Sequence, residues 1–188
     1  TKMETACTAQ VAEGLVVTTN SEKVRNARRN ILDMLLSNHK TDCFSCPSNG
    51  DCKLQELCFE YGIERTTYSG EQTELPIDDS NKFFTYNPNL CILCHRCVNT
   101  CHKVVGRGAI DTMERGFDSA IGTPFHIDWA DTNCESCGNC VQACPTGALT
   151  MKRRKNYRKY QIDKKVLTTC PHCATGCQYY LLVKDNKI

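Results

Sequence analysis

Cysteine dominates the chemistry that this sequence can perform. The 188 residues contain 16 Cys, and fourteen of them fall into four groups that each begin with C-x2-C. Two residues between thiols suit a loop that wraps one metal centre, whereas the disulfide frameworks of secreted proteins rarely repeat that spacing. The sequence therefore predicts metal ligation by reduced thiols, in a cytoplasmic setting.

Two copies of one motif carry the strongest signal. CILCHRCVNTC and CESCGNCVQACP both follow C-x2-C-x2-C-x3-C, and the second starts 43 residues after the first. In ferredoxins, three thiolates of such a run hold one cubane and the fourth ligates the sister cluster. We therefore expect two [4Fe–4S] clusters, one on Cys91, Cys94, Cys97 and Cys144, and the other on Cys134, Cys137, Cys140 and Cys101.

Zinc is the alternative ligand of C-x2-C pairs. Zinc sites use two such pairs, and this would leave the third and fourth Cys of each copy without a role. The first motif departs from the usual ferredoxin pattern only in having His102 where Pro commonly follows. Iron–sulfur clusters are the preferred interpretation.

A third thiol set precedes the repeat. In NHKTDCFSCPSNGDCKLQ, Cys43, Cys46 and Cys52 follow C-x2-C-x5-C, and His39 stands four residues before the first of them. A lone His is more often a surface or core residue than a ligand, but this one lies beside a three-Cys set that lacks a fourth member. A neutral imidazole in place of a thiolate should raise the reduction potential of a [4Fe–4S] cluster held there.

Three further thiols close the sequence. Cys170, Cys173 and Cys177 follow C-x2-C-x3-C, which supplies three ligands of a fourth [4Fe–4S] cluster. Of the two remaining cysteines, Cys58 is predicted to be a small buried hydrophobe. Cys7 would have a function only with partners upstream of residue 1. No residue is predicted to act as a general acid, base or nucleophile.

Helices and short strands must position these thiols. Residues 7–20 contain a β-branched run and look like a hairpin or sheet edge. A helix should begin at the cap Ser21 and end near His39, with an apolar stripe of Val24, Ala27, Ile31, Leu35 and Leu36. A short second helix over 52–62 should bury Leu54, Leu57, Cys58 and Tyr61.

The remaining segments connect the motifs. Residues 66–88 are polar and Pro-containing and should be extended, and residues 102–133 form an insertion between the two ferredoxin motifs. Residues 165–188 read as a strand, a Cys loop and a strand-turn. The basic stretch 152–159 is interpreted as a solvated linker or hairpin, with an acidic protein surface as second choice. A net charge of +2 argues against nucleic-acid binding, and no apolar run is long enough to span a membrane.

The order of these motifs resembles the N-terminal region of the catalytic (alpha) subunit of molybdenum- or tungsten-dependent formate dehydrogenases. The same front end occurs in the large iron–sulfur subunit of respiratory NADH dehydrogenase and in iron-only hydrogenases. Two complete ferredoxin motifs disfavour the respiratory subunit, which keeps one of the paired clusters. CPHCATGCQYYLLVKDNKI is similar to the opening of a molybdopterin oxidoreductase domain, which disfavours the hydrogenases.

The resemblance implies an α+β fold of small iron–sulfur domains in series. Residues 1–20 would be the remnant of a [2Fe–2S] plant-ferredoxin-like domain, with Cys7 as its last ligand. A His/Cys3 [4Fe–4S] domain over 21–80 and a two-[4Fe–4S] ferredoxin-like domain over 81–155 would follow. Residues 156–188 would begin the molybdopterin oxidoreductase domain, whose sequence further downstream would supply the fourth ligand of the last cluster.

The implied function is electron transfer for an oxidoreductase. Formate and CO2 would be interconverted at a molybdenum or tungsten bis-molybdopterin guanine dinucleotide centre outside this segment. The expected partner is a flavin- and iron–sulfur-containing NAD(P)H-oxidising subunit, with ferredoxin as a further acceptor. Two alternatives stay open: a non-catalytic polyferredoxin carrier, which the incomplete last site disfavours, and the same front end on another molybdopterin oxidoreductase, such as a nitrate reductase or an electron-bifurcating enzyme.

Overall fold

The computed structural model describes residues 2–153 and 161–188. Most of the basic stretch 152–159 lies outside the described residues, so its role as a linker stays a prediction. The helices and strands, in chain order, are α1 (Glu22–Ser37), α2 (Lys53–Glu60), β1 (Phe84–Tyr86), α3 (Arg96–Asn99), β2 (Asp111–Met113), β3 (Ala120–Gly122), α4 (Asn139–Ala143), β4 (Leu149–Met151), β5 (Lys164–Thr169) and β6 (Gln178–Val183). Single turns of other helix types lie at η1 (Pro88–Leu90), η2 (Thr100–Val105, a π-helix), η3 (Gly116–Asp118), η4 (Pro124–His126) and η5 (Trp129–Asp131).

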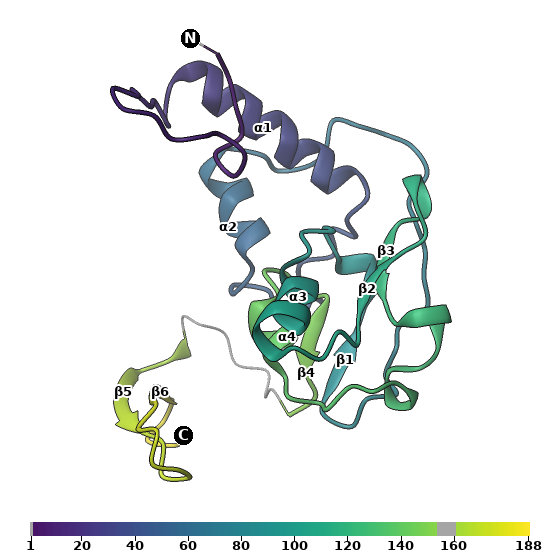
Figure 1. Ribbon diagram of the computed structural model, residues 1–188, viewed down its shortest axis with the longest axis vertical. Helices are drawn as coiled ribbons and strands as arrows, with labels where there is room; N and C mark the ends of the chain where they lie inside the picture. The colour runs from purple at the N-terminus through teal and green to yellow at the C-terminus, as the bar shows by residue number, and fades with distance from the viewer. Residues whose placement is uncertain (1, 154–160) are drawn as a thin grey trace.

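Two short antiparallel ribbons frame the central unit. Strand β1 pairs with β4, and β2 pairs with β3. Helices α3 and α4 lie side by side, and each lies within one of the two ferredoxin Cys motifs (Figure 1). The buried core between them consists of Phe84, Tyr86, Leu90, Cys97, Val98, Ile110, Ile121, Trp129, Ala148 and Leu149. The insertion expected over 102–133 therefore supplies both a ribbon and part of this core.

Helix α1 begins where the sequence predicts. The Oγ of Ser21 accepts a hydrogen bond from the amide of Val24 at 3.3 Å and so caps the first turn. Of the predicted apolar stripe, Leu36 is buried and Val24, Ala27 and Leu35 are partly buried. Ile31 is 53% exposed, and its neighbour Leu32, which was not predicted, is 6% exposed. Leu32 and Leu36, one helical turn apart, pack on the predicted apolar face of α2 and form a second small core with Leu54 and Cys58.

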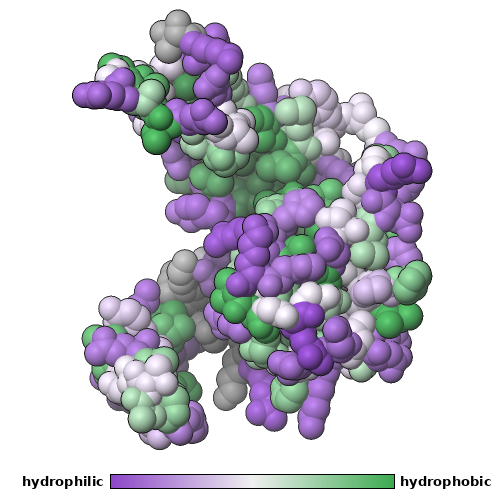
Figure 2. All heavy atoms as spheres, viewed as in Figure 1, coloured by the Kyte–Doolittle hydropathy of each residue, from purple (hydrophilic) through white to green (hydrophobic). Residues whose placement is uncertain are grey.

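The hairpin predicted over residues 7–20 is wrong. No strand occurs between residues 2 and 20, and Val11 and Val16 are 92% and 86% exposed. Figure 2 shows apolar side chains on the surface of this segment, at the upper left. An isolated two-stranded hairpin is marginal in water without an apolar face to pack against. Within the described ranges these β-branched residues pair with no sheet edge, so the local pattern does not produce a strand.

The expected extended connection holds over most of 66–88, but its end is a strand. Asp78 forms an isolated antiparallel bridge with Tyr86, and Phe84 to Tyr86 make β1. The strand, Cys loop and strand predicted near the C-terminus are confirmed as the antiparallel pair β5 and β6, with Thr169 opposite Gln178. Among the described residues, no helix is long and apolar enough to cross a membrane.

Candidate metal centres

The two ferredoxin motifs share one backbone conformation. Leu93 and Ser136 occupy equivalent positions and have φ values of 52° and 54°, and each donates its amide to the sulfur of the first Cys in its motif at 3.4 Å. His95 and Gly138 are also equivalent and also left-handed, with φ of 56° and 74°. Glycine adopts this conformation without strain, whereas for His95 it costs on the order of 1 kcal/mol. The repeated left-handed residues curl each loop around a pocket.

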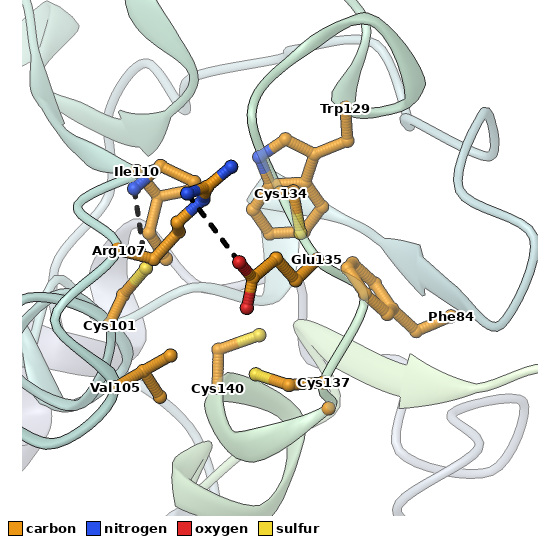
Figure 3. A pocket seen from close by; sticks show the side chains of 12 residues that line it. Phe84, Cys101, Val105, Arg107, Ile110, Trp129, Cys134, Glu135, Cys137 and Cys140 are labelled. Atoms are coloured by element: carbon orange, nitrogen blue, oxygen red, sulfur yellow. Dashed lines mark hydrogen bonds and ion pairs between the residues drawn. The ribbon is translucent and has the colours of Figure 1, made fainter.

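Each loop surrounds its pocket together with one cysteine from the other motif. The motif-1 pocket is lined by Cys91, Cys94, Cys97 and Cys144. The motif-2 pocket is lined by Cys101, Cys134, Cys137 and Cys140, and Figure 3 shows these four thiols around it. The structure thus brings together the two interleaved thiol sets that the sequence predicts, because the chain that leaves α3 and α4 takes the fourth Cys of each motif to the neighbouring loop.

Burial and neighbouring thiols both disfavour deprotonation of the pocket cysteines. Burial raises the pKa of Cys97 to about 12, and the nearby Cys91 and Cys144 add to that effect. Burial likewise raises the pKa of Cys140 to about 12, and here the neighbours that add to it include Cys134. Thiolates in such pockets repel one another, so the sites favour a positively charged metal group that stabilises the deprotonated sulfurs.

The number and arrangement of the thiols suit a cluster of several metal atoms. A tetrahedral zinc site holds its thiolates about 2.3 Å from one point. Across residues 2–153 and 161–188, no three His, Cys, Asp or Glu side chains converge in a way that could hold one metal ion. Four thiols around an open pocket fit a polynuclear cluster, whose iron atoms occupy the centre and leave the ligands further apart.

The third thiol set lies between α1 and α2. Burial raises the pKa of Cys43 and Cys52, and in both cases the nearby Cys46 raises it further. His39 lies just after α1, where its amide donates to the carbonyl of Leu36 at 3.2 Å. Its side chain is 7% exposed, and burial lowers its pKa. The imidazole is therefore neutral, which is the form that binds metals.

An unpaired polar atom of His39 also supports a role as a metal ligand. Within the described residues, its Nδ1 is buried and has no hydrogen-bond partner. An unsatisfied buried polar atom costs about 1–3 kcal/mol, so it is expected where a bound group completes the site. One neutral imidazole and three thiols form a donor set that fits an iron–sulfur cluster.

The His39 site abuts the motif-1 pocket. Cys46 packs against the ferredoxin-like core, and a β-carbon added at Gly147 would lie 2.7 Å from its Sγ. The amide of Lys53, the first residue of α2, donates to the carbonyl of Pro145 at 2.8 Å. Pro145 directly follows Cys144, so α2 is held against the loop that completes the motif-1 pocket.

Aromatic side chains join the two ferredoxin pockets. Trp129 is 2% exposed and lines the motif-2 pocket, while Tyr86 lines the motif-1 pocket. Their ring centroids are 5.0 Å apart, and the ring of Phe84 meets Trp129 edge-on at 4.9 Å. Nε1 of Trp129 is, with Nδ1 of His39, one of two buried side-chain polar atoms that lack a partner among the described residues. Sequence reasoning missed Trp129, although it is the sole tryptophan and stands five residues before the second motif.

An ion pair lies at the motif-2 pocket. Arg107 and Glu135 both line it, with Nη1 of the arginine 3.5 Å from Oε1 of the glutamate, and Figure 3 shows the two side chains directed toward each other. Nε of Arg107 also donates to the carbonyl of Asn133 at 2.6 Å. Both charged side chains are about half exposed. Sequence reasoning did not single them out either.

The remaining predicted cysteines line neither ferredoxin pocket. Cys170, Cys173 and Cys177 lie on the loop between β5 and β6, where the amide of Cys170 donates to the carbonyl of Cys177 at 2.8 Å. Cys7 is exposed in an N-terminal turn, and Cys58 is buried between α1 and α2 as predicted.

Family models match most of the thiol-bearing segments. Residues 28–67 match the iron–sulfur binding region of NADH-ubiquinone oxidoreductase G, and residues 82–150 match the ferredoxin-like domain of NADH-quinone oxidoreductase subunit 3. Residues 133–180 match a 4Fe–4S dicluster domain. Residues 28–67 and 82–150 are therefore iron–sulfur binding regions of the NADH-quinone oxidoreductase G and subunit 3 type, and the matched models support 4Fe–4S clusters as the groups that the segments bind.

The relatives are subunits of different oxidoreductases. The chain is 40% identical, over 98% of its length, to the alpha subunit of an NADPH-Fe(3+) oxidoreductase of Geobacter sulfurreducens. It is 27% identical, over its whole length, to a Staphylococcus aureus protein provisionally described as a formate dehydrogenase. The chain spans 21% and 23% of the lengths of these two proteins. An NAD+-reducing [NiFe]-hydrogenase structure matches 80% of the chain and 64% of its own length, with 29% identity and a TM-score of 0.74.

Proposed function

We propose that this segment relays single electrons through a series of [4Fe–4S] clusters within a larger oxidoreductase. The observation that carries the proposal is the contiguity of three ligand sets around one core. Cys46 of the His39 set packs on the ferredoxin-like core, and the motif-1 and motif-2 pockets share that core. Electron transfer is favoured when the edges of neighbouring clusters are close together. In this arrangement the paths between the proposed clusters run through the protein interior.

The ligand sets of the proposal are those of the interleaved motifs. His39, Cys43, Cys46 and Cys52 would hold the first cluster. The second would be bound by the four Cys of the motif-1 pocket and the third by those of the motif-2 pocket. Cys170, Cys173 and Cys177 would hold a fourth with a ligand from outside the segment. Bound there, the clusters would supply reversible one-electron chemistry. The protein's own residues hold the ligands, exclude water and set the local charge.

The finer proposal is a formate dehydrogenase subunit. In it, the electrons would come from or go to a molybdenum or tungsten bis-molybdopterin centre carried by sequence outside these residues, and an NAD(P)H-linked flavoprotein subunit or ferredoxin would be the partner. The β5 and β6 pair with its Cys loop supports this, since a loop of three ligands is what the opening of such a domain requires. The match of the whole chain to 23% of the Staphylococcus aureus protein also supports it. In this proposal Cys7 belongs to a [2Fe–2S] domain, and the enzyme is cytoplasmic.

A second candidate is a relay in an NADPH-linked oxidoreductase that does not use formate. The 40% identity to the Geobacter subunit favours it, because that match also extends over nearly all of the chain. The two candidates share the cluster relay and differ in the catalytic domain.

The experiment is an anaerobic purification of the intact protein with its partners. A relay predicts iron and EPR signals of several reduced [4Fe–4S] clusters, and formate dehydrogenase predicts bound molybdenum or tungsten and formate-dependent reduction of a viologen dye. NADPH-dependent dye reduction without formate activity, molybdenum or tungsten would select the second candidate. A protein with neither clusters nor dye reduction would overturn both.

A further inference from the structure

The indole of Trp129 presents a donor that no protein group in the described residues accepts. The side chain is 2% exposed, and its Nε1 is both buried and without a hydrogen-bond partner there. Leaving such an N–H unpaired in a protein interior costs free energy. Tryptophan in a core normally finds an acceptor for its N–H. The position therefore calls for an acceptor that belongs to the bound group.

The indole of Trp129 packs against two aromatic rings and also lines the motif-2 pocket. Phe84 meets the indole edge-on with the centroids 4.9 Å apart, and Tyr86 lies against it at 5.0 Å in a tilted arrangement. Both neighbours present carbon atoms to the indole, and the hydroxyl of Tyr86 is already committed to the carbonyl of Ile121 at 2.5 Å. The motif-2 pocket is the other surface that Trp129 meets, and Figure 3 shows its four thiols there.

The pocket would bring sulfur acceptors to this donor. In the proposed function, the pocket holds four thiolates and the sulfides of a [4Fe–4S] cluster, all of which are electron-rich. Phe84, Val105 and Ile110 also line the pocket, so its walls are largely apolar. A hydrogen bond to sulfur in such surroundings stabilises the more negative, reduced cluster and raises its reduction potential.

We propose that the indole N–H of Trp129 donates a hydrogen bond to a sulfur of the cluster held by the motif-2 pocket. This hydrogen bond would help to set the reduction potential of that cluster. The inference rests on the cluster assignment proposed above. It assigns to the sole tryptophan of the segment a role in setting the potential of one cluster, in addition to its place in the core.

The first test compares Trp129→Phe with Phe84→Leu in the full-length protein. Trp129→Phe removes the donor and keeps an aromatic ring, whereas Phe84→Leu disturbs the same wall without changing any donor. Redox titration followed by EPR should show a lower midpoint potential for the motif-2 cluster in Trp129→Phe. The other clusters should be unchanged, and Phe84→Leu should cause no such decrease. A normal potential in Trp129→Phe, with the cluster present, would overturn the proposal.

A second test uses the unaltered protein and so does not depend on the folding of a variant. Protein labelled with [indole-15N]tryptophan should show a weak 15N coupling to the reduced motif-2 cluster in pulsed EPR. Absence of the coupling while that cluster's signal is present would contradict the hydrogen bond. Absence of the cluster signal itself, defined as the signal that Cys140→Ser perturbs, would instead contradict the cluster assignment.

Discussion

Gly147 approaches Cys46 so closely that a β-carbon on the glycine would lie 2.7 Å from the cysteine Sγ. This contact joins the His39 site to the loop that follows Cys144, and so it joins two of the proposed electron-transfer centres. Gly147 needs no unusual backbone conformation here, and the absence of a side chain is its contribution. The relay depends on such close contacts between segments that are distant in the sequence.

Gly147→Ala should therefore loosen the His39 site. The added methyl group meets Cys46 Sγ, and relief requires a shift of the backbone or of a proposed ligand, at a cost of about 1–3 kcal/mol. We expect a lower unfolding midpoint and a broadened EPR signal from this cluster. Gly122→Ala is the matched control, because its β-carbon would meet only the flexible Met113 side chain at 3.3 Å. Equal effects of the two substitutions would argue against a tight junction at Gly147.

His39→Ala should remove or alter one cluster signal and leave the ferredoxin pair in place. The substitution deletes a buried imidazole whose Nδ1 has no partner within the described part of the chain. EPR and iron content report the outcome, with a loss of about one cluster's iron. His126→Ala is a control, since that imidazole is exposed and lies 2.9 Å from the Glu114 carboxylate. An unchanged spectrum for His39→Ala would exclude it as a ligand.

Substitutions in the ion pair at the motif-2 pocket should shift the reduction potential of the cluster. The direction of each shift distinguishes an effect of charge from an effect of packing. Arg107→Gln removes a positive charge beside the cluster and should lower its potential, while Glu135→Gln removes a negative charge and should raise it. Arg107→Lys should stay near the native value. Both groups are half exposed, so the shifts should shrink at high salt. Shifts in the same direction for Arg107→Gln and Glu135→Gln would mean that these residues act through packing alone.

The thiol sets were predictable because ligand spacing is local. C-x2-C-x2-C-x3-C fixes which sulfurs share a loop, and the left-handed residues that shape the two loops repeat at the same offsets in both motifs. The cap at Ser21 is equally local. The exchange of Cys101 and Cys144 between the two loops could be predicted only from the known ligand pattern of ferredoxins, because no periodicity in the sequence indicates it.

Features that depend on tertiary contacts could not be predicted in this way. Ile31 and Leu32 are adjacent apolar residues, and only the position of α2 decides which of them is buried. Residues 7–20 have strand-like composition but no sheet edge to join among the described residues. Trp129 and Arg107 belong to the insertion, and they reach the motif-2 pocket through the path of the chain between the motifs rather than through a motif of their own.

The central claim is that three contiguous ligand sets hold separate clusters, with the fourth Cys of each ferredoxin motif exchanged between loops. The most direct measurement is EPR of the reduced protein with Cys144→Ser compared with Cys101→Ser. We predict that Cys144→Ser perturbs the cluster of Cys91, Cys94 and Cys97, and that Cys101→Ser perturbs the cluster of Cys134, Cys137 and Cys140, with the His39 site intact in both. If each substitution instead perturbed the cluster of its own motif, the interleaved arrangement would be contradicted.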